Sequence, residues 1–343
     1  MQPAFVSLII PCRNEENYLP ALCASLDAQD IQSSSVEIIF VDGMSSDYTP
    51  DILIEYALTR PNVKILKNTA ITVPQAMNLG IRAATGAFIV RIDAHAEYSS
   101  DYAAKCVELL IRTGADNVGG PMRAKGIGFV GKAVGLAHHC RFGLGGGKFH
   151  DENFGGFVDT VYLGAFRRSI FDKVGYYDER LERNQDIELN ARIRNAEGLI
   201  FLSSEIHSTY HCRSTFSGLW KQNFNNGVWA VYTRAIAPYA LSLRHFIPLL
   251  FVTSLLLSLI VVGGPYLPLL IRILPLAATL GSYILASLFF SFSTAFKKGL
   301  LYFFVLPIVF AILHFSYGFG SLWGIVTLQN WLKSQTTNCH DKG

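Results

Sequence analysis

The sequence predicts an α/β domain with a mainly parallel sheet, followed by C-terminal transmembrane helices. Short apolar runs of strand length alternate with helix-like segments through the N-terminal half, and this alternation is typical of a parallel sheet with helices on both faces. Apolar residues are concentrated towards the C-terminal end, and hydrophobic residues make up 50% of the chain. The length of 343 residues allows for both parts, since one domain takes about 100 to 200 residues.

Strands and helices are expected in alternation over the first part of the chain. The second helix has a favourable start, because Thr49 can cap it and Pro50 suits its first turn. The strands are expected at residues 6–11, 36–42, 62–66 and 87–93, and the helices at 17–28, 49–57 and 73–84.

Three of the expected strands lead into acidic residues. The first reaches Pro11 and is followed by Arg13 and Glu15, while the second ends at Asp42 and the last at Asp93. Open α/β sheets bind ligands at the carboxyl ends of their strands. Acids placed there can hydrogen-bond a base or a ribose, or hold a divalent cation that neutralises a diphosphate.

Two common phosphate-binding motifs do not fit the sequence. A dinucleotide-binding Rossmann domain carries G-x-G-x-x-G after its first strand, whereas this strand is followed by Arg13, Asn14 and Glu15. The run GLGGGKF at 143–149 lacks the first glycine of a P-loop and its Ser or Thr. Glycines at 143, 145, 146, 147, 155 and 156 indicate either a lid that orders over a ligand or a passive surface loop.

Four motifs carry a family resemblance. In chain order they read IIPCRNEENYLPALCASL, VDGMSSDYT, GIRAATGAFIVRIDAHA and ERNQDIELNARI. In this order they resemble the motifs of family 2 glycosyltransferases with a GT-A fold, and in particular the membrane-attached succinoglycan biosynthesis type. The resemblance covers roughly the first two thirds of the chain. It implies a Rossmann-like GT-A domain and a hexosyltransferase that uses a nucleotide diphosphate sugar, with a UDP-sugar as the expected donor.

The resemblance also assigns residues to the donor. Asp42 would contact the nucleobase and Glu15 the base or the ribose, with Pro11 and Arg13 beside them. For Asp47, the expected role is that of a turn residue before the second helix.

A divalent cation is implied by Asp93-Ala94-His95, which stands in the place of the family's Asp-x-Asp signature. Asp93 would bind Mg²⁺ or Mn²⁺, or else the ribose. His95 would either supply an imidazole ligand, which Mn²⁺ accepts more readily than Mg²⁺, or hydrogen-bond a neighbouring group. His211, in a segment that reads as a strand, is a further candidate contact for the metal or the diphosphate.

Asp186 matches the family's catalytic base. Inverting transfer needs a base to take the proton of the acceptor hydroxyl. Gln185 replaces the more usual acid beside it, and Glu188 follows on the helix that begins here. The alternative for Asp186 is a helix N-cap, a position that Asp also favours.

Three apolar stretches, at 247–262, 273–293 and 300–320, predict about three membrane helices, since a spanning helix needs about 20 apolar residues. By the positive-inside tendency, Arg234, Arg244, Lys297 and Lys298 place their loops in the cytoplasm and the C-terminus outside. Three other cations oppose this topology: Arg272, Lys333 and Lys342.

Before the anchor, residues 216–239 mix aromatic and basic side chains. This composition suits the headgroup region of a membrane, although an ordinary core helix is the alternative. The expected divisions are a GT-A domain at 1–215, an interfacial segment at 216–245, the anchor at 246–324 and a polar tail at 325–343.

The net charge, the N-terminal sequence and the cysteines indicate where the protein is located and which partners it binds. A net charge of +3 gives no indication of a nucleic-acid partner. No secretory signal precedes the first strand, so the first domain is expected in the cytoplasm, with the chain held in the cell inner membrane as a multi-pass protein. The six cysteines form no CxxC pair and are expected to be reduced and mostly buried.

The sequence thus predicts an inverting, metal-dependent glycosyltransferase that acts on a membrane lipid-linked saccharide in polysaccharide biosynthesis. One alternative is a polyprenyl-phosphate sugar synthase, whose acceptor is a bare lipid phosphate. The other is a catalytically silent membrane module that binds nucleotide sugar, which the substitutions Gln185 and His95 keep open.

Overall fold

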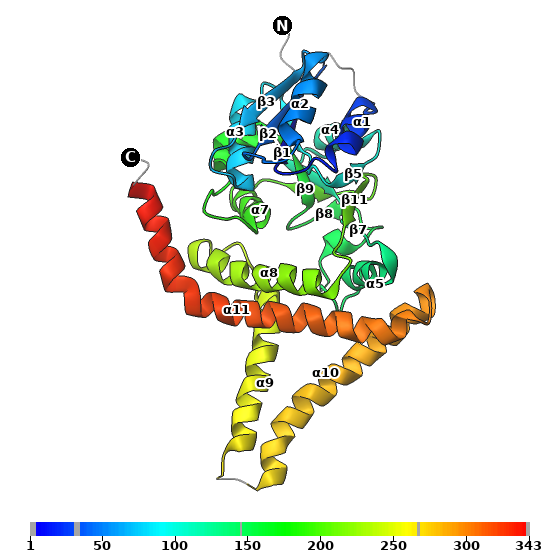
Figure 1. Ribbon diagram of the computed structural model, residues 1–343, viewed down its shortest axis with the longest axis vertical. Helices are drawn as coiled ribbons and strands as arrows, with labels where there is room; N and C mark the ends of the chain where they lie inside the picture. The colour runs from blue at the N-terminus through cyan, green and yellow to red at the C-terminus, as the bar shows by residue number, and fades with distance from the viewer. Residues whose placement is uncertain (1–4, 31–34, 145, 266–267, 341–343) are drawn as a thin grey trace. The chain divides into compact units, whose positions relative to one another are not determined.

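A computed structural model describes residues 5–30, 35–144, 146–265 and 268–340. The chain forms two compact units (Figure 1). The first comprises Met1–Arg123 and Lys148–His211, and the second comprises Ala124–Gly147 and Cys212–Gly343. Residues 124–147 thus leave the first unit and fold with the C-terminal part of the chain.

The first unit is built on an eight-stranded sheet of order β3-β2-β1-β4-β9-β6-β10-β8. The four strands at one side of the sheet are mutually parallel, as the sequence predicts. Beyond them β9 is antiparallel to both β4 and β6, so the whole sheet is mixed. The strands are β1 (Val6–Cys12), β2 (Val36–Asp42), β3 (Val63–Lys67), β4 (Phe88–Arg91), β6 (Asn117–Gly120), β8 (Gly156–Phe157), β9 (Tyr162–Arg167) and β10 (Ile200–Leu202).

Both faces of the sheet are buried, because successive side chains of a strand point to opposite faces. Leu8 of β1 joins one hydrophobic cluster with residues of α1, α2 and α4. Ile9, the next residue, joins a second cluster with residues of α3, α6 and α7. These helices are α1 (Leu19–Asp27), α2 (Thr49–Leu58), α3 (Val73–Ala83), α4 (Tyr102–Thr113), α6 (Ser169–Val174) and α7 (Gln185–Asn195). A separate strand, β5 (Ala96–Tyr98), pairs antiparallel with β11 (Ser208–His211).

A buried carboxylate joins neighbouring strands of the sheet. Glu37 of β2 is 4% exposed. It accepts hydrogen bonds from Ser7 Oγ (2.6 Å), Lys64 Nζ (2.7 Å) and Thr85 Oγ1 (2.9 Å). Burial alone would raise the pKa of Glu37, but these donors outweigh it and lower the pKa to about 2. The charged form is therefore the one that stabilises the fold.

We expect Glu37→Gln to lower the free energy of unfolding at pH 7 by about 2–3 kcal/mol, because the charged hydrogen bonds are lost. The pKa of Glu37 is depressed in the folded state, so its contribution is complete above the unfolded pKa of about 4.3 and declines as the pH falls towards 2. Thermal melts in detergent at pH 7, 4 and 3 should show the difference between wild type and variant shrinking with acid. Glu55→Gln, at an exposed position on α2, is the matched control. An equal difference at all three pH values would contradict this role.

The second unit consists of helices. Its members are α5 (Gly128–His138), α8 (Phe216–Ile236), α9 (Ile247–Gly263), α10 (Leu269–Lys298) and α11 (Tyr302–His340). Within the described part of the chain, three helices are long and apolar enough to cross a membrane: Leu243–Gly263, Leu269–Lys298 and Tyr302–Gln335. They coincide with the three predicted apolar stretches.

The glycine-rich segment begins in this second unit. Phe142 stacks on Phe290 of α10 and meets Phe310 of α11 edge-on. The carbonyl oxygen of Gly143 lies 3.2 Å from His314 Nε2. The start of the segment is therefore anchored on two apolar helices, while Gly145 lies outside the described residues.

Candidate active site

A pocket of about 200 Å³ lies in the first unit at the carboxyl ends of the parallel strands. The strands β1 and β4 are neighbours in the sheet, so the residues that follow them meet at one edge. Eight residues of this lining come from these two strand ends: Pro11, Cys12, Arg13, Glu15, Arg91, Asp93, Ala94 and His95. All the predicted donor and metal residues except Asp42 and His211 therefore line one pocket.

Glu15 and His95 face each other across the two strand ends. Glu15 Oε1 lies 3.1 Å from His95 Nδ1. The backbone N–H of Glu15 donates to Thr49 Oγ1 at 2.8 Å, which fixes the turn after β1. The Glu15 side chain is 15% exposed and that of His95 is 49% exposed. His95 is thus the member of this pair that is more open to a ligand.

Asp93 is held from two directions. Its Oδ1 accepts from Arg91 Nε at 2.9 Å. The Tyr98 hydroxyl accepts from the backbone N–H of Asp93 at 2.7 Å and donates to its carbonyl oxygen at 3.2 Å. Burial raises the pKa of Tyr98 well above its ordinary value, so the hydroxyl keeps the proton that it donates. The carboxylate is consequently pre-oriented towards the pocket.

Asp186 lies in the first turn of α7, near the same arginine. Burial would lower the pKa of Arg91, but the negative charges of Asp93 and Asp186 outweigh burial and raise it. The two carboxylates therefore act on one guanidinium. Asn184 holds the N-cap position of α7, with a φ of 60°, so Asp186 is not the cap residue.

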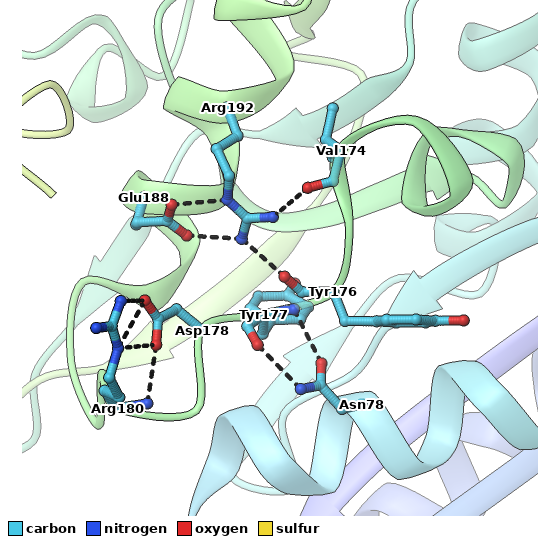
Figure 2. Close-up of polar contacts among 8 residues, drawn as sticks. All are labelled: Asn78, Val174, Tyr176, Tyr177, Asp178, Arg180, Glu188 and Arg192. Carbon is cyan, nitrogen blue, oxygen red and sulfur yellow. Dashed lines mark hydrogen bonds and ion pairs between the residues drawn. The ribbon is translucent and has the colours of Figure 1, made fainter. Parts of the chain in front are cut away.

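Glu188, the other acid of this motif, has a structural role. Figure 2 shows that both of its oxygens accept from Arg192, at 2.7 Å to Nε and 2.7 Å to Nη2. Arg192 Nη2 also donates to the Tyr176 carbonyl at 2.7 Å, which joins α7 to the segment before it. The ion pair is buried at Glu188, where 2% of the side chain is exposed.

Asp42 lies beside the pocket at the end of β2. Its Oδ1 accepts from the Ser45 hydroxyl at 2.5 Å, and the next residue, Gly43, lines the pocket. Asp47 caps the start of α2, because its Oδ1 accepts from the N–H of Thr49 at 3.0 Å. The expected turn role of Asp47 is therefore confirmed.

His211 does not line this pocket. Its Nε2 lies 3.0 Å from Glu97 Oε1, and its buried Nδ1 has no hydrogen-bond partner among the described residues. The preceding residue, Tyr210, pairs with Ala96. His211 therefore lies at the end of β11 that approaches the turn carrying His95.

Two residues of the site have no predicted role, and a sequence signal exists for one of them, Arg91. Arg91 is a charge inside an otherwise apolar strand, and such residues are seldom buried without a partner. Ile71, which also lines the pocket, has a φ of 72°. Positive φ is strained for a β-branched residue, and nothing in its sequence context indicates this conformation.

Comparison with known proteins identifies the fold and the chemistry. The family model "Glycosyl transferase family 2" matches residues 7–175. The succinoglycan biosynthesis protein ExoA of Rhizobium meliloti (strain 1021) is 31% identical over 223 residues, which are 64% of this chain and 67% of the relative. The chain belongs to glycosyl transferase family 2. It is accordingly a glycosyltransferase.

Two further relatives extend the comparison for this family 2 chain. The dolichyl N-acetyl-alpha-D-glucosaminyl phosphate 3-beta-D-2,3-diacetamido-2,3-dideoxy-beta-D-glucuronosyltransferase of Methanococcus voltae is 27% identical over 65% of this chain and 72% of its own length. The mannosyltransferase PcManGT of Pyrobaculum calidifontis, solved with GDP-Man and Mn²⁺, superposes with a TM-score of 0.60 at 17% identity over 94% of this chain and 90% of its own. That likeness supports the predicted GT-A fold.

The described residues contain no group of three or more His, Cys, Asp or Glu side chains placed to share one metal ion.

Proposed function

We propose that this enzyme is an inverting, metal-dependent glycosyltransferase, which moves a sugar from a nucleotide diphosphate sugar to a membrane lipid-linked saccharide. One observation carries the proposal. The pocket brings Glu15, Asp93 and His95 together. The negative charge of Asp186 contributes to the raised pKa of Arg91, which also lines the pocket. Asp186 is not in the pocket lining, and its charge acts on the same arginine as the donor-binding Asp93, which supports assigning both to one reaction.

The nucleoside half of the donor is assigned to the ends of β1 and β2. Asp42 would receive the base, and Glu15 the base or ribose, between Pro11 and Arg13. Carboxylates accept hydrogen bonds from ring N–H and ribose O–H groups. A UDP-sugar is the expected donor.

The residues present fit Mg²⁺ or Mn²⁺. Asp93 supplies a hard oxygen and His95 a half-exposed imidazole at the same pocket, and Mn²⁺ accepts the imidazole more readily. When bound, the cation would neutralise the diphosphate of the leaving nucleotide. His211, with its unpartnered Nδ1, is a secondary candidate for the metal or the diphosphate.

Asp186 is assigned as the base that takes the proton of the acceptor hydroxyl. Its neighbour Gln185 is buried and cannot ionise, and Glu188 is bound by Arg192. Asp186 is thus the carboxylate of this motif that is available for proton transfer. The presence of a carboxylate side chain at position 186 argues against a catalytically silent module.

The acceptor is assigned from the apolar helices and from the relatives. A membrane-held enzyme meets a lipid-linked substrate at the bilayer surface. The Methanococcus voltae relative is named for a dolichyl sugar phosphate acceptor, and the Rhizobium meliloti relative for succinoglycan biosynthesis. We infer polysaccharide assembly at the cell inner membrane, with the first unit in the cytoplasm.

Release of nucleotide diphosphate tests the proposed reaction. Purified protein is incubated with a panel of nucleotide sugars and with Mn²⁺, Mg²⁺ or EDTA. Each reaction is run with a lipid-linked saccharide extract, with polyprenyl phosphate or without lipid. Metal-dependent release that requires the saccharide extract is the expected result. Release with bare polyprenyl phosphate would identify a polyprenyl-phosphate sugar synthase, and no release with any donor would identify a silent module.

We expect the protein to remain with membranes during washes with about 1 M salt or with alkaline carbonate. The reason is that burying helices of this length in hydrocarbon is effectively irreversible, unlike surface binding. Immunoblots of pellet and supernatant measure the partition, with a peripheral membrane protein as control. Quantitative release by carbonate would show that no helix spans the bilayer.

A further inference from the structure

The last helix, α11, is packed against α8 with close backbone contact. A Cβ atom on Gly227 of α8 would lie 2.1 Å from the carbonyl oxygen of Tyr317. A Cβ atom on Gly320 of α11 would lie 2.0 Å from the carbonyl oxygen of Phe224. The Ser321 hydroxyl donates to the Gly227 carbonyl at 3.2 Å. Only small residues permit such an approach, so the two helices are held together over this region.

The same pairing continues towards the end of α8. Gly324 meets Val228, and the hydroxyls of Tyr232 and Thr327 are 2.8 Å apart. The Trp331 ring then stacks on Tyr232 with centroids 4.3 Å apart. Residue numbers rise together in both helices, so the second half of α11 runs parallel to α8 (Figure 1).

Of these two helices, α8 is too polar to cross a bilayer. It carries Lys221 and Gln222, followed by Asn223, Asn225 and Asn226. It is not among the helices of the described chain that are apolar enough to span. A lysine at the centre of a spanning helix strongly disfavours insertion into the bilayer. Because α11 runs along α8, its second half is held at the same depth outside the hydrocarbon core.

The contacts of α11 with α9 also indicate that the second half of α11 lies outside the hydrocarbon core. Gly318 lies against Pro248 and Val252, in the first turns of α9, and Phe315 packs on Phe251. If α11 crossed the bilayer as α9 does, Gly318 would be about 24 Å from the start of α11 and close to the far end of α9. Instead α11 crosses the first turns of α9 and the last turns of α10, which are the ends opposite the loop that joins these two helices (Figure 1).

We propose that α9 and α10 alone cross the membrane, as a hairpin, and that α11 lies with α8 on the lipid surface. This inference rests on the membrane attachment proposed above. Exposed apolar side chains of α11 would enter the interface: Phe304, Ile308, Trp323, Ile325 and Val326. The C-terminus then stays on the side that holds the first unit, whereas three spans would carry it to the opposite side.

With this topology, the lysines that follow the third apolar stretch no longer oppose the positive-inside tendency. Lys333 and Lys342 would lie on the same side as Lys297 and Lys298, which agrees with the positive-inside tendency; Lys342 itself is outside the described residues. Arg272, in the first turn of α10 at the opposite end of the hairpin, donates to the carbonyl oxygens of Val262 and Gly264 at the end of α9. It is a helix-terminal cation with a local structural role.

Labelling of introduced cysteines in sealed vesicles tests the topology. One reporter is Leu58→Cys, at an exposed site in the first unit, and another is Gly263→Cys, which has open space around its Cβ position. The third is a cysteine appended after Gly343. All are made in the full chain with Cys339→Ser. The other five cysteines, Cys12, Cys23, Cys106, Cys140 and Cys212, are buried and can stay. The parent chain with only that change is the control for background labelling.

A membrane-impermeant maleimide should modify the first-unit and C-terminal reporters from the same side, and Gly263→Cys from the other. Modification of the C-terminal reporter together with Gly263→Cys would overturn the inference and establish three spans, leaving the proposed attachment intact. If all three reporters were modified from one side, α9 and α10 would not cross, and both the hairpin and the proposed anchor would be rejected.

Discussion

Asp186→Asn is expected to lower kcat by about 10²–10⁴, the usual contribution of a general base, with little change in donor affinity. An amide keeps the size of the side chain but cannot accept the acceptor proton at neutral pH. The bond from the Ile187 N–H to Asp186 Oδ1, 2.9 Å long, can be kept by the amide oxygen. Steady-state rates and donor calorimetry together separate the two effects.

The comparison variant is Asp172→Asn, an exposed acid on α6, which should retain wild-type rates. If Asp186 had a purely structural role, Asp186→Asn would keep wild-type activity, because asparagine would preserve the local hydrogen bond. Near wild-type kcat in Asp186→Asn would reject the catalytic assignment. Glu188 would not be its replacement, since removing that carboxylate leaves Arg192 unpaired in a buried site.

The parallel half of the sheet was predictable because its signals are local. The strands β1, β2 and β4 are short apolar runs that lead into polar residues, and each of β1, β2 and β3 is followed by a helix pattern. The antiparallel strand β9 joins β4 to β6, and this pairing depends on contacts far apart in the sequence. No local pattern specifies such a partner.

For helix α2 the predicted first residue is correct, but the predicted capping residue is wrong. The helix begins at Thr49, as predicted, but Thr49 is not its cap. Asp47 caps the helix, and the Thr49 hydroxyl accepts from the N–H of Glu15. Propensity identifies the kind of residue at a helix start, whereas tertiary contacts decide which backbone group it satisfies.

The residues of the candidate site that follow the strands were predictable from the sequence, whereas Arg91, within β4, was not predicted. Asp93 and His95 follow β4 and carry the family pattern, so sequence alone indicates them. Arg91, by contrast, points into the site only because β4 lies in the centre of the sheet, between β1 and β9. Residues 124–147 belong to the second unit, and their amino-acid composition gives no indication of this.

Asp93→Ala is expected to abolish the effect of Mn²⁺ on donor binding. Loss of this ligand should weaken metal binding by at least about 10–100-fold, the range known for groups that merely support a ligand. The variant also frees the Arg91 guanidinium that Asp93 binds in the wild type. A cation of this kind attracts a diphosphate, so weak, metal-independent binding should remain.

Calorimetry with UDP, in Mn²⁺ and in EDTA, distinguishes these contributions to donor binding. Wild type should bind more tightly with Mn²⁺, and Asp93→Ala should bind equally in both buffers. Asp42→Ala is the matched control, because a base contact lies outside the metal site. It should weaken binding in both buffers and keep the Mn²⁺ effect. If Mn²⁺ still tightened binding to Asp93→Ala, the cation would be held by other groups, and His95 with His211 would be the next pair to replace.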